Sequence, residues 1–273
     1  MITDFRLQTS WIFMVHATEI EQWLHRLYIA AEGAGLRFED RRKALEVASM
    51  LEELEREIRR FSRTSPLVLV DAAAGKSYVG LLAAKLLLDS SGRRASVVTI
   101  EQDPKRVQAS IQAVRRLQAS TPVECILADV ATEEAWPREA SIVAALHACG
   151  PAADAIIDRT ISTRARQLLL VPCCTSDALP SAANARAQAE KLGIPRHAPV
   201  RRRFIQAIVD AHRTWRLEAA GYQTEVVEFV PPTVTPHNLL WRSRLVGEPK
   251  RMQAARQKLA ALALDPLKNC EPK

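Results

Sequence analysis

Acidic side chains close three consecutive apolar stretches of this 273-residue sequence. Asp71, Glu101 and Asp129 each stand at or just after the end of a short run rich in valine, isoleucine and leucine. If these runs are parallel strands, their carboxyl ends meet at one edge of a sheet, where open α/β folds bind ligands. There Glu101 can accept hydrogen bonds from ribose hydroxyls, and Asp129 from an adenine amino group. Each acid alone could equally be a solvated residue at the start of a loop, but three in succession favour a nucleoside site.

The first acid opens a turn of small residues, Asp71-Ala72-Ala73-Ala74-Gly75-Lys76-Ser77-Tyr78. Two interpretations compete for it. Gly75-Lys76-Ser77 imitates the end of a phosphate-binding P-loop, but that motif requires a further glycine where Val70 stands. The alternative is a site for S-adenosylmethionine, in which small residues let the backbone approach the methionine part of the cofactor and Asp71 helps to anchor it. The acids of the next two strands favour this alternative, because a P-loop protein has no need for them.

Histidine and cysteine residues follow the next two predicted strands, in Leu146-His147-Ala148-Cys149-Gly150-Pro151 and Val171-Pro172-Cys173-Cys174. Thiolate and imidazole are good zinc ligands, but adjacent cysteines in an extended chain point in opposite directions, so we expect no metal. Thiols that pack beneath a cofactor are the preferred interpretation. His147 is the candidate general base, with a structural histidine bonded to backbone as the alternative. Asp154 is a second catalytic candidate, and its alternative role is structural, in the helix after this strand.

These two segments resemble those of a known family. The HxCG-A-x-D pattern of residues 147–154 and the PCC pattern of residues 172–174 are similar to the methyltransferase domain of eukaryotic tRNA 2′-O-methyltransferases of the acceptor stem. They also look like the methyltransferase domain that is joined to a glutathione-transferase-like domain in animals. The resemblance covers roughly Leu67 to Arg244, including the Asp71 to Tyr78 turn and Thr235-Pro236-His237-Asn238. After PCC, Thr175-Ser176-Asp177 replaces the histidines of the tRNA enzymes, and their cysteine-rich zinc-finger segments are missing.

The resemblance implies a class I methyltransferase fold with S-adenosyl-L-methionine as the cofactor. The residues expected to contact the cofactor are Asp71, Ala73, Gly75, Tyr78, Glu101, Gln102, Asp129, Val130 and His147. The residues expected on the substrate side are Lys76, Cys173, Cys174, Arg202 and Arg203. The predicted catalytic residues are His147 and Asp154.

The basic balance of the chain favours an anionic partner. The formal net charge is +7 and the pI is about 9.4. Arg201-Arg202-Arg203 precedes a predicted helix, whose positive end it does not suit, so it is either a phosphate contact or a solvated run. Taken with the resemblance, this balance leads us to expect methylation of RNA, and the resemblance implies a ribose 2′-hydroxyl of tRNA or rRNA as the acceptor. The alternatives are a small-molecule methyltransferase and a non-catalytic module that binds S-adenosylmethionine, and the oligomeric state is left open.

Strand and helix patterns alternate in the way that predicts an α/β fold with a doubly wound, mostly parallel, seven-stranded sheet. The strands are expected at residues 67–71, 95–101, 123–127, 141–146, 167–171, 223–230 and 239–246, the last of them antiparallel. Apolar residues at helical spacing predict helices over residues 17–31, 39–61, 76–88, 104–117, 203–220 and from 252 onward, with one more after Pro151. The dense charges of the 39–61 helix are interpreted as its solvated side. We expect residues 175–199 to form a loop with a helical piece, over or beside the site.

These patterns divide the chain into a helical N-terminal extension (residues 1–62), a methyltransferase domain (63–247) and a C-terminal helical tail (248–273). The five cysteines are odd in number and form no CxxC pair, so reduced thiols in a cytoplasm are expected. The apolar patch Trp11 to Val15 is too short to span a membrane, and we expect no membrane association.

Overall fold

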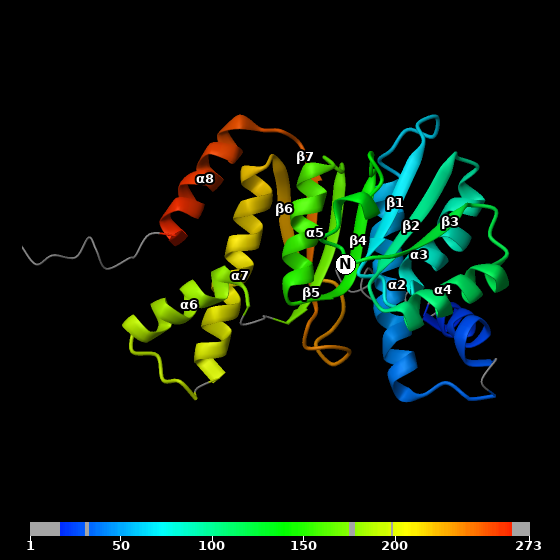
Figure 1. Ribbon diagram of the computed structural model, residues 1–273, viewed down its shortest axis with the longest axis horizontal. Helices are drawn as coiled ribbons and strands as arrows, with labels where there is room; N and C mark the ends of the chain where they lie inside the picture. Colours follow the sequence, from blue (N-terminus) through cyan, green and yellow to red (C-terminus); the bar gives the residue numbers. More distant parts are fainter. Residues whose placement is uncertain (1–16, 31–32, 175–177, 198, 264–273) are drawn as a thin grey trace, which may run out of the picture.

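Parallel strands form the centre of the molecule. The computed structural model describes residues 17–30, 33–174, 178–197 and 199–263. Its seven-stranded sheet has the order β3-β2-β1-β4-β5-β7-β6 (Figure 1). The strands are β1 (Leu67–Ala72), β2 (Ala95–Glu101), β3 (Val123–Leu127), β4 (Ile142–Cys149), β5 (Gln167–Cys174), β6 (Tyr222–Glu228) and β7 (Leu239–Leu245). This is the class I methyltransferase arrangement that the sequence predicted.

The direction of each strand decides where a ligand can bind. β7 pairs antiparallel with both β5 and β6, whereas β1 to β5 pair parallel with one another, as expected for the last strand. The chain moves outward from β1 to β3 and then returns to start again at β4 on the other side of β1. A crevice therefore opens at the carboxyl ends of β1 and β4, where such sheets bind their ligands.

Helices cover both faces of the sheet. One hydrophobic cluster joins the sheet to the helical segment that starts at residue 17 and to α2, α3, η3 and α4, and a second joins the other face to α5 and α7. The helices are η1 (His25–Ile29), α2 (Phe38–Ile58), α3 (Tyr78–Leu82), η3 (Ala83–Leu88), η4 (Asp89–Ser91), α4 (Pro104–Leu117), η5 (Glu133–Ala135), α5 (Pro151–Ser162), α6 (Pro180–Lys191), α7 (Pro199–Ala219) and α8 (Pro249–Ala263).

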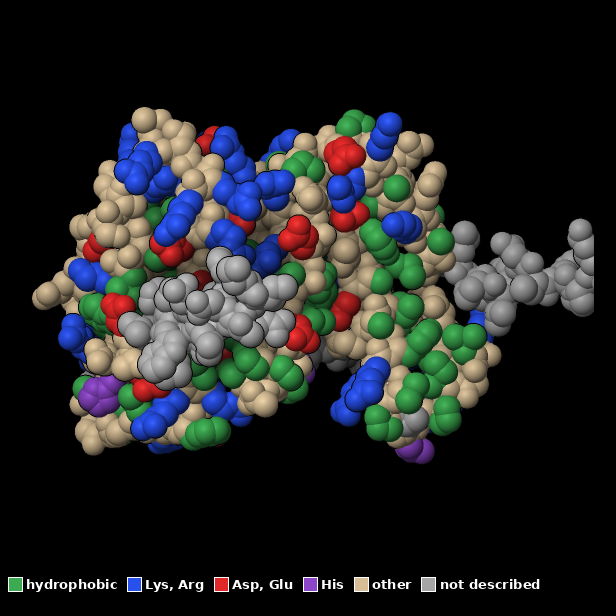
Figure 2. Space-filling model, turned by 180° about the vertical axis from the view of Figure 1, so that it is seen from behind, with side chains coloured by type: hydrophobic (Ala, Val, Ile, Leu, Met, Phe, Trp, Pro, Cys, Tyr) green, Lys and Arg blue, Asp and Glu red, His purple; other side chains and the backbone are tan. Residues whose placement is uncertain are grey.

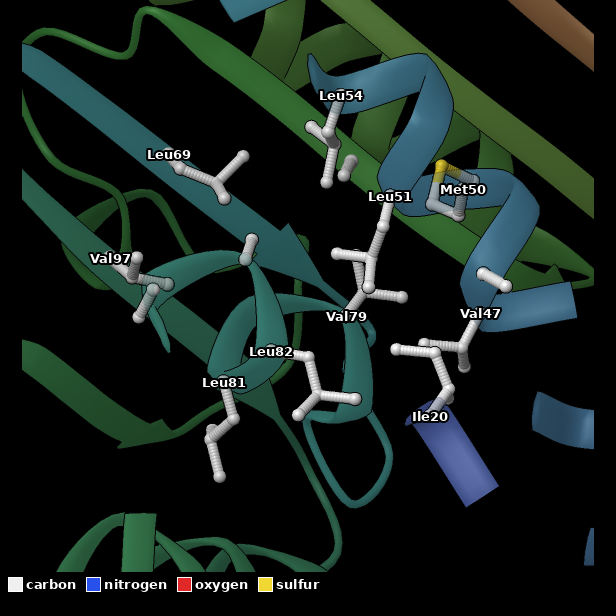
Figure 3. Packing of buried hydrophobic residues seen from close by; sticks show 14 of the residues in the cluster. Ile20, Val47, Met50, Leu51, Leu54, Leu69, Val79, Leu81, Leu82 and Val97 are labelled. Carbon is white, nitrogen blue, oxygen red and sulfur yellow. The ribbon is translucent and has the colours of Figure 1, made fainter. Parts of the chain in front are cut away.

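Helix α2 packs as its apolar spacing predicts. Val47, Leu51 and Leu54 point toward Val79 and Leu82 of α3, next to Leu69 of β1 (Figure 3). Three of its carboxylates, those of Glu46, Glu53 and Glu57, are also buried, so the interpretation of its charges as a solvated side is wrong for these residues. The physical reason is that each acid has a basic partner. Glu46 pairs with Lys43 and His147, Glu53 pairs with Arg56 and Arg242, and Glu57 pairs with Arg60.

Polar contacts fix α2 along its length against distant parts of the chain. Near its start, Arg42 Nε donates a hydrogen bond of 2.6 Å to the carbonyl oxygen of Val234. Near its end, Arg242 Nε of β7 donates to Glu53 Oε2 at 2.7 Å. These two contacts hold both ends of the helix against the part of the chain that includes β7.

Helix α6 is the helical piece expected within residues 175–199. It packs against α7 through Leu179, Ala182 and Val209. In Figure 1, α6 and the first half of α7 extend beyond the sheet on the side where β1 to β5 end. Helix α8 follows β7 and lies against α7, where Lys258 Nζ is 3.9 Å from the ring centre of Trp215. None of the helices described combines the length and apolarity that crossing a membrane requires.

Candidate functional site

Two adjoining cavities lie at the carboxyl ends of β1, β2 and β4. The first, here called the strand-end cavity, has a volume of about 430 Å³. The second, here called the turn cavity, has a volume of about 370 Å³ and includes the turn after β1. Ala73, Arg106 and His147 line both cavities. Both volumes fall within the range of about 300–1,000 Å³ that is usual for small-molecule sites.

The turn after β1 is shaped by three residues in the left-handed region. The φ angles are 54° for Ala73, 59° for Gly75 and 57° for Ser77. Glu101 Oε2 accepts a hydrogen bond of 2.7 Å from the Gly75 amide, and Glu101 Oε1 accepts one of 2.9 Å from the Asp103 amide. The buried carboxylate of Glu101 thus connects the turn after β1 to the start of α4, in the wall of the strand-end cavity.

This arrangement is unsuited to a triphosphate. In a P-loop, the backbone amides of the turn bind phosphate oxygens. Here the Gly75 amide donates to the carboxylate of Glu101, and the carboxyl group of Asp71 lines the turn cavity. A phosphate placed at this turn would meet these acidic groups, so the structure disfavours the P-loop interpretation.

Asp71 is buried at the end of β1, with 2% of its surface exposed. Its Oδ2 accepts a hydrogen bond of 2.8 Å from the Gly80 amide. Burial raises the pKa of Asp71 to about 7, against the lowering effect of the hydrogen bond from Gly80. A Cβ atom at position 80 would lie 3.0 Å from both Asp71 Cβ and Thr99 Cγ2, so glycine allows α3 to approach the carboxyl group this closely.

The far wall of the strand-end cavity comes from the ends of β2 and β3. Gln102, Asp129 and Val130, which the sequence analysis expects to contact the cofactor, line this cavity. Asp129 is exposed, and its Oδ1 accepts a hydrogen bond of 2.8 Å from the Ala131 amide, so the carboxylate keeps capacity to accept from a further donor. The loop is fixed by Trp136, whose indole nitrogen donates to the Val130 carbonyl at 2.8 Å.

Aromatic residues cover the turn cavity from the N-terminal side. Tyr78 lines this cavity, and its ring meets that of Tyr28 edge to face, with the ring centres 4.8 Å apart. The Tyr28 hydroxyl donates to the carbonyl oxygen of Lys76, and Lys76 also lines the turn cavity. Burial raises the pKa of Tyr28 well above its usual value, so it remains a hydrogen-bond donor. The N-terminal helices thus hold the turn in place.

His147 lies between the two cavities, at an irregularity of β4. Its φ angle is 65°, a left-handed conformation that is uncommon for a residue with a side chain, and the pairing of β4 with β5 shifts register at this point. The Nε2 atom is 2.9 Å from Glu46 Oε2 of α2. Because an ionised carboxylate can only accept, the shared proton is on Nε2, and in the neutral form of the ring Nδ1 is the nitrogen with a lone pair.

Cys149 and Cys173 are joined in a disulfide, with their Cα atoms 5.3 Å apart. The prediction of reduced thiols is therefore wrong for this pair, because the irregular end of β4 brings Cys149 beside β5. The prediction of a cytoplasmic location rested on reduced thiols, so this disulfide removes that argument for it. Cys149 is exposed and lines the strand-end cavity, and the side chain of Cys174 lies outside the described residues. Among the residues described, no cluster of histidine, cysteine and acidic side chains is arranged to hold a metal ion.

Asp154 occupies a structural position, in contrast to the catalytic role predicted for it. Its Oδ2 accepts hydrogen bonds from Arg213 at 3.1 and 2.8 Å, and its Oδ1 accepts one from Arg216 at 2.8 Å. Arg213 is completely buried, with 0% of its surface exposed. Asp154 faces α7, whereas Pro151, Ala152 and Ala155 of the same helix line the strand-end cavity. The pairing compensates a buried charge and joins α5 to α7.

Arg202 and Arg203 lie outside the site. Both are exposed near the start of α7, and neither lines the strand-end cavity or the turn cavity. The prediction that they bind substrate can hold only for a substrate that reaches well beyond the cavities. Arg201 of the same run donates to the carbonyl oxygen of Ile194 at 3.1 Å and is largely buried, so it has a structural role.

The sequence interpretation missed four residues that the structure places at the site: Tyr28, Lys43, Glu46 and Arg106. A signal was present for Glu46, because the acids at positions 46, 53 and 57 repeat the spacing of the apolar positions 47, 54 and 58. Carboxylates that follow a buried stripe so closely indicate buried acids with partners. Tyr28 and Arg106 gave no comparable signal, because aromatic and basic residues are common on helices that cover a sheet.

The residues present fit S-adenosylmethionine. The two cavities provide adjoining compartments, with carboxyl groups of Glu101 and Asp129 in one and of Asp71 in the other. These carboxyl groups can accept hydrogen bonds from a ligand that has hydroxyl and amino groups at one end and a cationic amino acid at the other. The turn between the compartments begins with small residues, Ala73-Ala74-Gly75, which leave the backbone accessible.

A family model described as a methyltransferase domain matches residues 42–179. The match begins within α2 and extends past β5, and it covers about half of the chain. A search of curated proteins finds no significant match to this sequence.

Several solved structures are similar to the chain at low sequence identity. A methyltransferase from Podospora anserina with bound S-adenosylhomocysteine has a TM-score of 0.49 at 14% identity, over 90% of this chain and 97% of that one. Magnesium protoporphyrin IX methyltransferase from Synechocystis PCC 6803 has a TM-score of 0.47 at 14% identity, over 84% and 95%. An rRNA methylase from Streptococcus thermophilus has a TM-score of 0.42 at 10% identity, over 78% and 99%. These likenesses assign no substrate to this chain.

Proposed function

Because the chain belongs to the family of methyltransferase domains whose model it matches, we propose that it transfers a methyl group to RNA, at a ribose 2′-hydroxyl of tRNA or rRNA. The methyl donor is S-adenosyl-L-methionine, in keeping with the family and with the class I order of the sheet. When bound, this cofactor supplies an electrophilic methyl group on a sulfonium. The acceptor belongs to the proposal, and the following observations support it.

We assign the two cavities to the two ends of the cofactor. The strand-end cavity takes the nucleoside, with Glu101 as acceptor for the ribose hydroxyls and Asp129 for the adenine amino group. The turn cavity takes the methionine part, whose ammonium group is held near Asp71. Such an ammonium favours the ionised form of Asp71, which burial alone opposes. Ala73 and His147, which line both cavities, lie beside the reacting methyl group in this assignment.

The position of His147 is the observation that carries the proposal. A hydroxyl group is a weak nucleophile, and it benefits from a base that takes its proton as the new bond forms. His147 holds its Nε2 proton toward Glu46 and so presents Nδ1 as that base. As the oxygen–methyl bond forms, the sulfur–methyl bond breaks, its electron pair stays on sulfur to give a neutral thioether, and the hydroxyl proton passes to Nδ1.

The surface beyond the site suits a polyanion. In Figure 2 the part of the molecule formed by α6, α7 and α8 stands apart from the main body at the lower edge, and one group of Lys or Arg side chains lies on that part beside the notch. Arg202 and Arg203 are exposed on α7, at the end of that helix nearer to the carboxyl ends of β1 to β5. An RNA whose ribose enters the site could place neighbouring phosphates against this surface.

The alternative of a small-molecule substrate depended on a lid formed by residues 175–199. In the described part of this segment, α6 packs on α7 and lines neither cavity. No described residue of the segment therefore encloses the site as a lid, which weighs toward a substrate that approaches from outside.

Incubation with tritiated S-adenosylmethionine tests the proposal. We expect label to enter total RNA, and to be lost with the variant Glu101→Ala, while the variant Glu124→Ala of the exposed β3 surface retains it. Label only in a metabolite or protein pool would contradict the RNA substrate. Binding of S-adenosylmethionine without transfer to any pool would instead indicate a non-catalytic module.

A further inference from the structure

Glu46 is a buried acid that belongs to α2 and not to the sheet. Only 5% of its surface is exposed, and its Oε2 accepts hydrogen bonds from His147 Nε2 at 2.9 Å and from Lys43 Nζ. Burial raises the pKa of Glu46, but the hydrogen bonds from His147 and Lys43 outweigh this effect and hold it below its usual value. Glu46 therefore remains an anion next to the imidazole ring.

From this geometry, we propose that Glu46 is a positioning residue for methyl transfer: it orients the imidazole of His147 and stabilises the imidazolium that forms when Nδ1 accepts the substrate proton. Glu46 lines neither cavity itself, so it acts through His147. The inference rests on the proposed function, because it assumes that His147 receives a proton from a hydroxyl group. The N-terminal helix α2 thereby becomes part of the active site.

The orientation of the ring follows from the single contact. A carboxylate that accepts from Nε2 fixes both the tautomer and the plane of the imidazole, as an acidic residue does for the histidine of serine hydrolases. The left-handed backbone of His147 adds a second constraint, because such conformations persist only where surrounding contacts hold them. Glu46 provides one of these contacts from outside β4.

The rigidity of α2 makes the contact effective. Arg42 is bound to the Val234 carbonyl on one side of Glu46, and Glu53 is bound to Arg242 of β7 on the other. Lys43 lines the turn cavity while it binds Glu46, so the same pair connects the methionine side of the site to the base. The family match starts at residue 42 and thus includes both Lys43 and Glu46.

Two variants and a matched control test the role of Glu46. Glu46→Ala removes the acceptor, whereas Glu46→Gln keeps an oxygen that can accept from Nε2 but removes the charge. Glu55→Gln is the control, since Glu55 lies on the same helix, is more exposed and pairs with Arg59. We expect both Glu46 variants to bind S-adenosylmethionine with an affinity within about twofold of the wild type, because Glu46 does not line the cavities.

The rate of transfer should separate a positioning role from a structural one. At saturating RNA and cofactor we expect a loss of about 10–100-fold in Glu46→Ala, by analogy with removal of the hydrogen-bonding partner of a metal-ligating histidine. Glu46→Gln should also be slow, because its amide cannot stabilise an imidazolium. A normal rate in a folded Glu46→Gln variant would overturn the proposal, since a merely structural hydrogen bond would be restored.

A spectroscopic readout on the cofactor-free protein is independent of activity. In the wild type and in Glu55→Gln, the ring Nε2 proton of His147 should be protected from exchange with water and visible in ¹H–¹⁵N spectra, with its assignment taken from His147→Asn. It should be lost in Glu46→Ala. An unchanged ring signal in that variant would overturn the proposal even if RNA is labelled. An unlabelled RNA pool with the expected ring signals would contradict the proposed substrate and leave the Glu46–His147 contact established.

Discussion

Glu101 binds two backbone amides with its two carboxylate oxygens and still lines the strand-end cavity. Each oxygen can accept one more hydrogen bond, so the side chain is organised for ribose hydroxyls before any ligand arrives. Asp71 differs from Glu101 in its protonation, because its buried carboxyl group carries a proton near neutral pH. These two acids therefore respond differently to substitution.

Replacing Glu101 by alanine should weaken binding of S-adenosylmethionine. We expect a loss of about 1–3 kcal/mol in binding free energy, because the ribose hydroxyls lose an acceptor in a partly buried site. Titration calorimetry of the variant against the wild type measures the loss, with Glu124→Ala as the control on the exposed surface of β3. An unchanged affinity in the folded Glu101 variant would contradict the assignment of the strand-end cavity to the nucleoside.

Asp71 should make the stability of the cofactor-free protein depend on pH. Its pKa is about 7 in the folded protein and about 4 in an unfolded chain, so between these values the folded protein holds a proton that the unfolded chain has released. Raising the pH through this window therefore favours unfolding, and the stability contributed at pH 4 is lost by about pH 7.

The variant Asp71→Asn, which keeps an oxygen for the Gly80 amide, should lack this loss. The difference in unfolding free energy between the variant and the wild type should grow in favour of the variant as the pH rises, by up to about 4 kcal/mol. Thermal unfolding of both proteins between pH 4 and 8 measures it. A difference that does not vary with pH would show that the buried carboxyl group titrates at its ordinary value.

The residue scale also shows what the sequence could predict. Asp71, Glu101 and Asp129 were identifiable because strand ends recur at one edge of a parallel sheet, so chemistry follows from position in the chain. The spacing of Glu46 indicated that it is buried, but its partner could not be predicted, because its contact with His147 joins positions 101 residues apart. Asp154 was misassigned for the same reason, because its partners are on α7.

At the scale of elements, β4 and β5 are connected beyond their hydrogen bonds. The Cys149–Cys173 disulfide closes a loop with a sequence separation of 24, which contains α5. The strand and helix order was predictable from hydrophobic periodicity, and the irregular end of β4 was not. A register shift there depends on the neighbouring strand, so the predicted strand at 141–146 ended three residues early and concealed the disulfide.

Reduction of this disulfide should lower the stability of the protein. The entropy of closing such a loop corresponds to about 3 kcal/mol, or about 6–12 °C in the unfolding temperature of a domain of this size. Thermal unfolding with and without dithiothreitol measures the effect. Cys149→Ser should be destabilised and insensitive to the reductant, whereas Cys125→Ser should respond like the wild type. An unfolding temperature of the wild-type protein that does not change with dithiothreitol would contradict the Cys149–Cys173 pairing.

At the scale of the whole molecule, two helical parts flank the carboxyl edge of the sheet. The start of α2 lies on one side and α6 with the start of α7 on the other, with residues 231–238 between them (Figure 1). The helices could be predicted from the sequence. Their packing could not be predicted: α6 packs on α7 and leaves the cavities open. That outcome depends on the small apolar contacts Leu179, Ala182 and Val209, which could equally have packed elsewhere.

The double variant Arg202→Glu/Arg203→Glu should weaken RNA binding without changing the affinity for the cofactor. We expect affinity for RNA to fall and the dependence of log K on log salt concentration to become shallower by about 1.4–2, as two phosphate contacts are lost. Arg94→Glu/Arg164→Glu is the matched control, since these arginines are exposed at the opposite edge of the sheet. Equal effects of the two double variants would mean that only net charge matters.

The central claim, methyl transfer from S-adenosylmethionine to a ribose 2′-hydroxyl, is tested most directly by alkaline hydrolysis of RNA labelled by this protein. Alkali cleaves RNA through attack by the 2′-hydroxyl, which a methyl group on that oxygen prevents. We predict that tritium is recovered in alkali-resistant dinucleotides, and that His147→Asn, assayed at saturating cofactor, yields little of this product. Label recovered entirely in mononucleotides would place the methyl group on a base and contradict the account.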